Sequence, residues 1–460
     1  MSGQDLEFET GRSREGRRCS APNPTGRNQH RNCRMSPSLI ELYEPPENVV
    51  RAATKDDSRV EEALRDYQRR NIVNKETIKQ LLLAEHGIEM STATITRRRK
   101  LLGLKGSGAT TKSLPETQKR QLILDQMAKH PTPKWRSTPP VVLAHGVSRR
   151  VSLATRSSVY PDILSRDYIS AEMHALDPDG FVIRQPKSKK KHRVALVVLG
   201  PDFEWSCDGH DKLSGIGFPI WGVRDVWCGK WLGLWVVPNN RLKRVIAYLY
   251  LRLVKERGGM PVQTTTDRGS ETTGVYAFAS ALREEFSRDL PVDQLPAHRF
   301  LPSIENTTIE RGWLRLRLEW GDDVKLFWEA GKDIYNEMDP RQYELVQYLW
   351  PKLIQQELDS LRERLNNHKP RRDNAKLTPT GVAPAVAYTL AERYGGERGL
   401  QPVDTKLIEG LMEELGGEDL VRFVSRDYEA RADEIFSTIG VEKLSFANVW
   451  MVFERMLPLM

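Results

Sequence analysis

The stretch that decides the fold is residues 200–210, which read GPDFEWSCDGH. Residues 203–207 form a short β-like run, and Asp208 follows it directly. Around this stretch, from residue 193 to residue 331, the chain alternates between strand-like and helical patterns. Strands are expected at 194–199, 218–223, 231–237, 261–266 and 298–301, and helices at 241–257, 275–286 and 306–320. This order predicts an α/β layer arrangement with a mixed sheet.

Composition narrows the class of protein. The chain has 460 residues, 39% of them apolar, which is enough for several domains and a substantial core. Its 70 Lys and Arg against 62 Asp and Glu give a formal net charge of +8, which allows a nucleic-acid partner without proving one. Four cysteines are too few for a disulfide framework. With no apolar run near the about 18 residues of a membrane span and no signal-peptide core, we expect a soluble intracellular protein without membrane association.

The region before the core has two predicted parts. Residues 1–58 are rich in Arg, Ser, Pro, Gly and Asn and are expected to form a disordered basic tail, which serves in nuclear import or nucleic-acid binding or is simply solvated. Residues 107–192 are expected to contain helices at 114–130 and 167–176 and end in the densest basic cluster of the chain. Its central residues, expected to contact phosphates, to act as an import signal or to form a solvated linker, are Lys189, Lys190 and Lys191.

Residues 59–106 predict a pair of short helices. Asn74 can cap a helix that Gly87 ends, and Ser91 can cap a second helix that Gly103 ends. A helix, a short turn and a polar second helix form the outline of a helix-turn-helix, whose second helix enters the major groove of DNA. A plain helical hairpin is the alternative. The candidate DNA contacts on the second helix are Thr94, Arg97, Arg98 and Lys100.

The region after the core is expected to be helical. Residues 332–384 predict a helical extension with a basic, Pro-rich tail, and residues 385–460 predict a helical C-terminal region. In the last region, a stripe of apolar positions predicts a helical bundle for packing or self-association: Leu407, Leu411, Leu415 and Leu420.

Three acidic residues of the core are candidates for chemistry. Asp208 and Asp267 follow expected strands, and Glu310 lies one turn into an expected helix. Such positions can converge on one crevice although they lie far apart in sequence. Three adjacent carboxylates raise one another's pKa unless cations neutralise them, and Mg²⁺ prefers oxygen ligands. Two such ions, about 3.5–4 Å apart, support in-line phosphoryl displacement. Taken singly, each Asp is more often a turn former or a helix cap.

The local context of the acids resembles a known family. Residues 200–210, 266–271 and 303–313 are similar to the first, second and third acid segments of integrase-core proteins of eukaryotic genomes, relatives of retroviral integrases and DDE transposases. Residues 366–372 and 378–381 resemble the basic tail of the same family. The resemblance covers about residues 74–381. It implies an RNase H-like fold in which Asp208, Asp267 and Glu310 bind two Mg²⁺ or Mn²⁺ ions.

The resemblance also implies an activity and partners. Members process DNA 3′-ends and then join the freed 3′-hydroxyl to a target phosphodiester, generally as multimers that bridge two DNA ends. We therefore expect DNA as partner, a homo-oligomer and a nuclear location. The sequence departs from the family at Ser270 and Thr272, where Gly and Asn are common, and at Arg99, an apolar position of the recognition helix. The retroviral zinc module is absent, because Cys19, His30 and Cys33 supply only three ligands.

Residues beside the acids are candidates for supporting roles. His210 is expected to contact DNA or a metal-bound water, or to shape a turn. Glu271 is expected to cap the next helix or to support the metal site. Asn306 is expected to cap the helix that carries Glu310 and to position it. Three residues of that helix either hold donor DNA or form a solvated face: Arg311, Arg315 and Arg317.

Together these observations predict a transposon-derived, integrase-like DNA strand transferase. Two alternatives are open. The chain is a domesticated, non-catalytic DNA-binding protein that keeps the fold as a scaffold, or it is an RNase H-like nuclease that cuts without joining.

Overall fold

The computed structural model describes residues 51–52, 58–127, 164–176, 197–302 and 306–460. All of them belong to one compact unit, Val49–Met460. The basic tail and the cluster of Lys189, Lys190 and Lys191 lie outside the described residues, so the expectations about them stay predictions. In the part of the chain that is described, no helix combines the length and the apolar character needed to cross a lipid bilayer.

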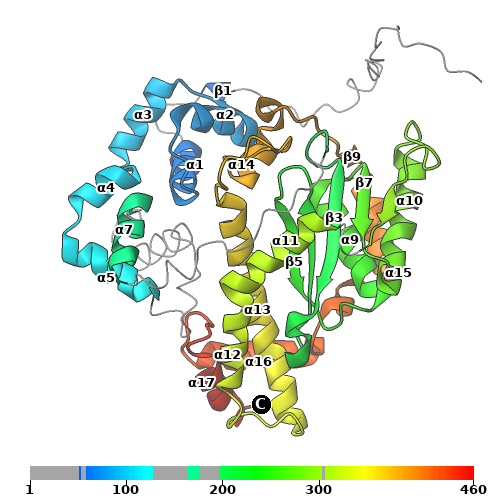
Figure 1. Cartoon of the computed structure of the whole chain (residues 1–460). Helices are drawn as coiled ribbons and strands as arrows, with labels where there is room; N and C mark the ends of the chain where they lie inside the picture. The colour runs from blue at the N-terminus through cyan, green and yellow to red at the C-terminus, as the bar shows by residue number, and fades with distance from the viewer. Residues whose placement is uncertain (1–50, 53–57, 128–163, 177–196, 303–305) are drawn as a thin grey trace, which may run out of the picture. The chain divides into compact units, whose positions relative to one another are not determined.

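A five-stranded mixed sheet carries the candidate site (Figure 1). Its order is β5-β4-β3-β7-β8. β3 is antiparallel to β4, which is antiparallel to β5, whereas β7 runs parallel to both β3 and β8. The predicted mixed α/β class is confirmed. The strands are β3 (Glu204–His210), β4 (Ile220–Asp225), β5 (Trp231–Val236), β7 (Gln263–Thr266) and β8 (His298–Phe300).

Two expectations about the first strand are wrong. Asp208 lies inside β3 and pairs with Gly222 of β4, rather than following the strand. A strand was expected at 194–199; residues 194–196 lie outside the described residues, and 197–199 form no strand. Leu199 instead accepts a backbone hydrogen bond of 3.1 Å from Glu397, so this segment pairs with a distant loop and not with the sheet.

Alternation along the strands supplies two hydrophobic layers. On β3 and β4, Trp205 and Trp221 point to the side covered by α9 (Lys243–Arg257). On β4 and β5, Ile220 and Leu234 point to the other side, where α13 (Pro340–Asn367) packs. Successive side chains of a strand point to opposite faces of the sheet. Because helices cover both faces here, β4 and β5 are apolar at nearly every position and not only at every second one.

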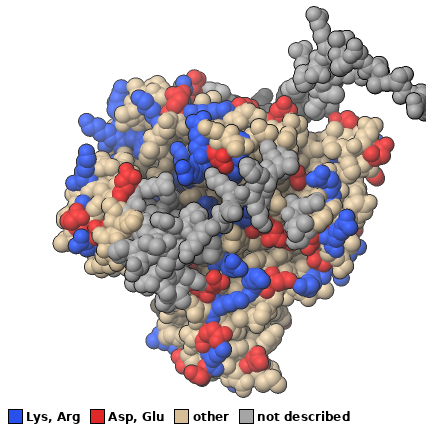
Figure 2. Space-filling model, viewed as in Figure 1, with Lys and Arg blue, Asp and Glu red and all other residues tan. Residues whose placement is uncertain are grey.

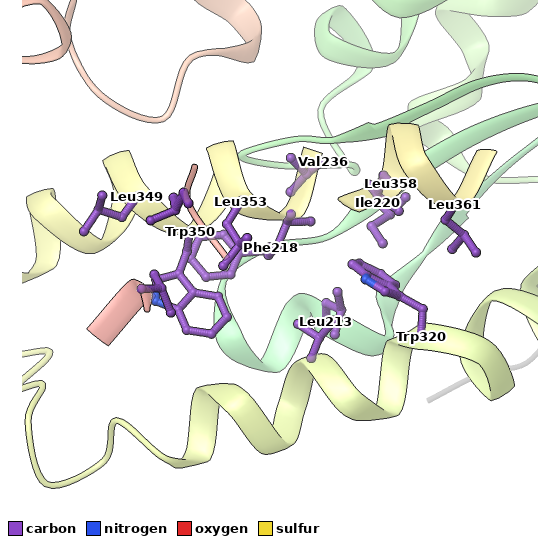
Figure 3. Close-up of a cluster of buried hydrophobic side chains, with 14 of the residues drawn as sticks. Leu213, Phe218, Ile220, Val236, Trp320, Leu349, Trp350, Leu353, Leu358 and Leu361 are labelled. Carbon is purple, nitrogen blue, oxygen red and sulfur yellow. The ribbon is translucent and has the colours of Figure 1, made fainter. Parts of the chain in front are cut away.

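The helices around the sheet follow the expected order. α10 (Thr273–Phe286) packs against α9. α11 (Thr307–Leu316) continues through a π-helical turn (Arg317–Gly321) into α12 (Asp322–Glu329). Figure 3 shows side chains of α13 packed with residues of β4, β5 and this helical stretch, among them Leu353, Ile220, Val236 and Trp320.

The outer edge of β5 is closed by two amide side chains of α13. The side chain of Asn366 accepts from the backbone N–H of Trp231 at 2.7 Å and donates to the Trp231 carbonyl at 2.9 Å. Gln355 accepts from Val236 N–H at 3.1 Å and donates to the Leu234 carbonyl at 3.0 Å. These amides satisfy backbone groups that an edge strand otherwise leaves unpaired.

The C-terminal region packs on the core. α15 (Thr405–Leu415) contacts α9, and α16 (Arg426–Thr438) and α17 (Val449–Met456) contact α13. A short strand, β9 (Gln401–Pro402), pairs with β6 (Gly259–Met260), so the region is not wholly helical as expected. The predicted apolar stripe is confirmed for Leu411, Leu415 and Leu420, which are partly buried against the core. It is wrong for Leu407, which is 44% exposed, and it missed Ile408 and Met412, which are buried.

The predicted helix pair is present. α2 (Lys75–His86) follows α1 (Ser58–Arg69) and begins at Asn74, whose side chain accepts from the N–H groups of Glu76 and Thr77; it ends at Gly87 with a φ of 64°. α3 (Thr92–Leu101) begins at Ser91, which accepts from the N–H of Thr94. Its buried side packs together with α14 (Pro384–Thr389). Among the described residues, the other helices before the core are α4 (Ser107–Ser113), α5 (Glu116–Met127) and α7 (Arg166–Leu176).

Candidate functional site

Asp208 is the most constrained of the three acids. Its Oδ2 accepts a hydrogen bond of 2.8 Å from the indole N–H of Trp313, and its Oδ1 accepts one of 2.9 Å from the backbone N–H of Gly209. The pKa of Asp208 is raised to about 7, mainly by burial; the negative charges of Asp267 and Glu310 add to the rise, and the hydrogen bond from Trp313 opposes it. Asp208 is therefore a carboxyl group poised between its two charge states at neutral pH.

Asp267 and Glu310 lie within electrostatic reach of Asp208. Asp267 follows β7 directly and is partly buried, and Glu310 lies exposed in the first turn of α11. Both carboxylates contribute to the raised pKa of Asp208. The sequence places the three acids 59 and 43 residues apart (267 − 208 and 310 − 267), so the sheet and α11 bring distant segments toward one region.

The donor set fits Mg²⁺ in its chemistry, because all three groups offer hard carboxylate oxygens. A bound cation would also offset both the burial of the Asp208 charge and its repulsion by Asp267 and Glu310. The arrangement is open, however. Among the described residues, no three acidic, His or Cys side chains stand close enough together to hold a metal ion.

The loop after Asp267 is held by a threonine and not by the predicted glutamate. The Thr272 hydroxyl donates to the carbonyls of Gly269 at 2.7 Å and Asp267 at 3.3 Å, which fixes the turn between β7 and α10. The side chain of Glu271 lies against Gly269, where an added Cβ would meet its Oε1 at 2.2 Å. Within the described chain, Glu271 makes no capping bond to α10, so the expected cap is wrong.

Trp313 links the first acid to His210. The two rings are stacked, with centroids 4.8 Å apart and an interplanar angle of 17°. His210 is 8% exposed, and burial lowers its pKa to about 4, so the ring is neutral at pH 7. His210 thus supports the face of Trp313. Trp313 lies in the third acid segment of the resemblance, but no role was assigned to it from the sequence.

Asn306 occupies the N-cap position directly before α11, but its side chain makes no capping bond there, so the predicted capping hydrogen bond is wrong. The amide instead accepts a hydrogen bond from the Ser206 hydroxyl and donates to the Cys207 carbonyl at 3.4 Å. All of these atoms are buried. Asn306 therefore fastens α11 to the part of β3 that precedes Asp208. Ser206 was not predicted; its only signal is a hydroxyl between two apolar strand positions.

The predicted DNA contacts of the core helix are exposed. Arg311 and Arg315 lie on the solvent side of α11, and Arg317 lies on the turn that follows. Arg315 approaches His368 at 3.4 Å, a residue of the basic tail. A row of cations beside the acids can hold phosphates, although a solvated face has the same appearance.

The predicted DNA contacts of the helix pair and the residues around them divide into exposed and structural groups. Arg97 and Lys100 are exposed, and the hydroxyl of Thr94 bonds to Ser91 at 3.0 Å. Arg98 is partly buried. Arg99, which departs from the family pattern, donates to the Val73 carbonyl at 2.9 Å and to Gln68 at 2.8 Å, and so fastens α3 to the preceding helices. Figure 2 shows Lys and Arg side chains gathered over α3 at the upper left.

Comparison with known proteins adds no relative. No family model matches the chain, and no curated protein matches it either.

Proposed function

We propose that this chain is an integrase-like DNA strand transferase with an RNase H-like core. The observation that carries the proposal is the effect of Asp267 and Glu310 on Asp208: two carboxylates from distant segments lie near enough to add to the raised pKa of the third. A mixed sheet with helices on it and a helix pair with a basic second helix are compatible with that family. Nuclear location and assembly into a homo-oligomer belong to the same proposal.

In this proposal Asp208, Asp267 and Glu310 bind two Mg²⁺ or Mn²⁺ ions. Bound there, such ions would supply the Lewis-acid chemistry of an in-line phosphoryl transfer. The chain's own residues prepare the site. Trp313 holds one oxygen of Asp208, and Asn306 holds the start of α11 against β3, which limits where Glu310 can lie. Supporting contacts of this kind orient metal ligands.

The exposed cations supply the DNA-binding part of the proposal. Arg311, Arg315 and Arg317 would hold the backbone of the donor strand beside the acids, and Arg97 and Lys100 would contact duplex DNA through α3. Phosphate contacts of this kind give affinity and position, whereas sequence is read through base edges.

The test is cleavage and joining of labelled DNA by the full chain. The substrates are duplexes that carry the terminal sequences of the genomic element around the gene, incubated with Mg²⁺ or Mn²⁺. We expect Asp267→Asn to abolish both products, and Asp293→Asn, an exposed aspartate in the loop before β8, to leave them unchanged. If Asp267→Asn retains full activity, the assignment of the acids is overturned.

The second candidate function is a non-catalytic DNA-binding protein. It is favoured by the open arrangement of the described acids, which form no closed metal-holding group. Thermal unfolding with and without Mn²⁺ separates the two, because a ligand that binds the folded state raises its stability. A nuclease that does not join is distinguished from a strand transferase by the absence of longer, joined products.

A further inference from the structure

Three aromatic rings gather beside the second acid. Tyr276 of α10 meets His298 of β8 edge-on, with centroids 5.8 Å apart at 81°, and lies 5.7 Å from the ring of Phe300 at 34°. His298 and Phe300 are 4.6 Å apart at 65°. The three rings form one continuous aromatic surface that joins α10 to the edge strand of the sheet.

This aromatic surface lies at the end of the sheet that carries Asp267. β7 and β8 are parallel, and Phe300 pairs with Thr266, the residue before Asp267. Tyr276 lies four residues after Thr272, which binds the Asp267 carbonyl, so it stands about one helical turn from that loop. His298 also contacts Thr266, at 3.1 Å between its Nε2 and Oγ1.

The rings differ in exposure. His298 is 4% exposed and forms the underside of the surface, whereas Tyr276 is 49% exposed and Phe300 is partly exposed. His298 is therefore a core residue, whereas Tyr276 and Phe300 present ring surface to solvent at this end of the sheet.

An exposed cation lies near this surface. Arg268 is exposed and follows Thr266, the strand partner of Phe300, by two residues. Glu271 of the same loop lies against Gly269. Aromatic faces flanked by Lys and Arg are the usual means of binding single-stranded nucleic acid, because bases stack on the rings and cations follow the phosphates.

We propose that Tyr276 and Phe300 form a stacking platform for one unpaired base of the DNA strand bound at the acids. This inference rests on the proposed function and adds a substrate feature to it: the bound end, or the target, has a base that has left the duplex. Two stacking rings fit any base, so the platform positions a strand without selecting its sequence.

The test is base stacking measured without catalysis. The full chain in EDTA is titrated with oligonucleotides that carry 2-aminopurine either in an unpaired terminal base or inside the duplex, and the quenching of its fluorescence is followed. Three variants are compared with the wild type: Tyr276→Leu, Tyr276→Phe, and Tyr343→Leu, the last a tyrosine of α13 that is 50% exposed. Thermal unfolding of each variant verifies that it is folded.

We expect the unpaired base to be quenched by the wild type, by Tyr276→Phe and by Tyr343→Leu. Tyr276→Leu should lose the quenching and bind the unpaired oligonucleotide at least about fivefold more weakly. If Tyr276→Leu binds DNA and quenches the unpaired base as strongly as the wild type does, the stacking platform is overturned. The proposed function is then unaffected, provided that the wild type cuts DNA when Mg²⁺ is present. Absence of any DNA binding by the wild type overturns the platform together with the proposed function. A change of oligomeric state in Tyr276→Leu with unchanged DNA binding assigns the surface to a second copy of the chain and also overturns the proposal.

Discussion

The indole N–H of Trp313 donates a hydrogen bond of 2.8 Å to Oδ2 of Asp208, across 105 residues of sequence. The bond joins the helix that carries the third acid to the strand that carries the first. It also lowers the pKa of Asp208 against the raising effects of burial and of the neighbouring acids. Trp313 therefore favours the charged form of Asp208 and fixes its orientation.

Replacing Trp313 with Phe should weaken metal binding. The ring that stacks on His210 is kept, while the hydrogen bond to Asp208 is lost. Loss of such a supporting bond typically costs about tenfold or more in metal affinity. The measurement is a Mn²⁺ titration followed by thermal unfolding of the full chain. Trp320→Phe is the matched control, because that buried indole nitrogen has no partner among the described residues. Equal Mn²⁺ affinity in Trp313→Phe and the control would contradict this role.

The buried pair of Ser206 and Asn306 should behave as one unit. Removing either side chain leaves the other with an unsatisfied polar group, which costs about 1–3 kcal/mol of stability. Removing both should cost less than the sum of the single changes, because neither partner is then left unpaired. Urea unfolding of Ser206→Ala, Asn306→Ala and the double variant measures the coupling. Strictly additive effects would show that the pair does not fasten α11 to β3.

Asp225 should make stability depend on pH. This residue, 0% exposed, accepts hydrogen bonds of 2.8 Å from the N–H groups of Asp202 and Cys228. Burial first, and the charge of Asp202 next, raise the pKa of Asp225 from 3.8 to about 6. The folded protein therefore holds a proton that the unfolded chain releases at lower pH. The contribution to stability, about 3 kcal/mol, is complete below pH 3.8 and is lost as the pH rises through 6.

The check is the midpoint of thermal unfolding measured from pH 4 to pH 7 for the wild type and for Asp225→Asn. The variant is expected to be less stable at low pH, because its amide N–H faces the N–H of Asp202. The unfolding midpoint of the variant should nevertheless fall less steeply with rising pH than that of the wild type. The slope does not vanish, because the raised pKa of Asp208 acts in the same direction up to about pH 7. An unchanged slope would mean that Asp225 titrates normally.

Replacing the cations of α3 should have two different effects, on DNA binding or on stability, depending on the residue. Arg97→Ala and Lys100→Ala are expected to weaken DNA binding with little loss of stability, and each should lower the slope of log affinity against log salt by about 0.9. Arg99→Ala should instead lower the thermal stability of the chain, because its guanidinium holds Val73 and Gln68. Fluorescence anisotropy over a range of NaCl concentrations, paired with thermal unfolding, tells these effects apart.

The sequence predicts correctly those parts of the structure that depend on residues close together in the chain. Asn74, Gly87 and Ser91 act within one turn of their own helices, so the caps of α2 and α3 follow directly from the residue types. The mixed α/β class likewise follows from runs of residues that each indicate one element.

The parts that the sequence did not predict depend on distant partners. Asn306 is a residue type that often caps helices, but its side chain bonds instead to the hydroxyl of Ser206, 100 residues away in sequence. The buried face of α15 contains Ile408 and not Leu407, because α9 determines which side is covered. The contact of Trp313 with Asp208 has no signal in spacing, since a tryptophan in an amphipathic helix is expected in the core.

The amides of Gln355 and Asn366 also bear on how the protein can be shortened. A fragment that stops at residue 331 keeps all five strands of the main sheet but exposes the backbone groups of Trp231, Leu234 and Val236 that α13 now satisfies. Bare strands of this kind pair with other chains, and the result is aggregation. A stable fragment that contains the three acids must therefore extend through Asn367, the end of α13, however far the acids lie from it in sequence.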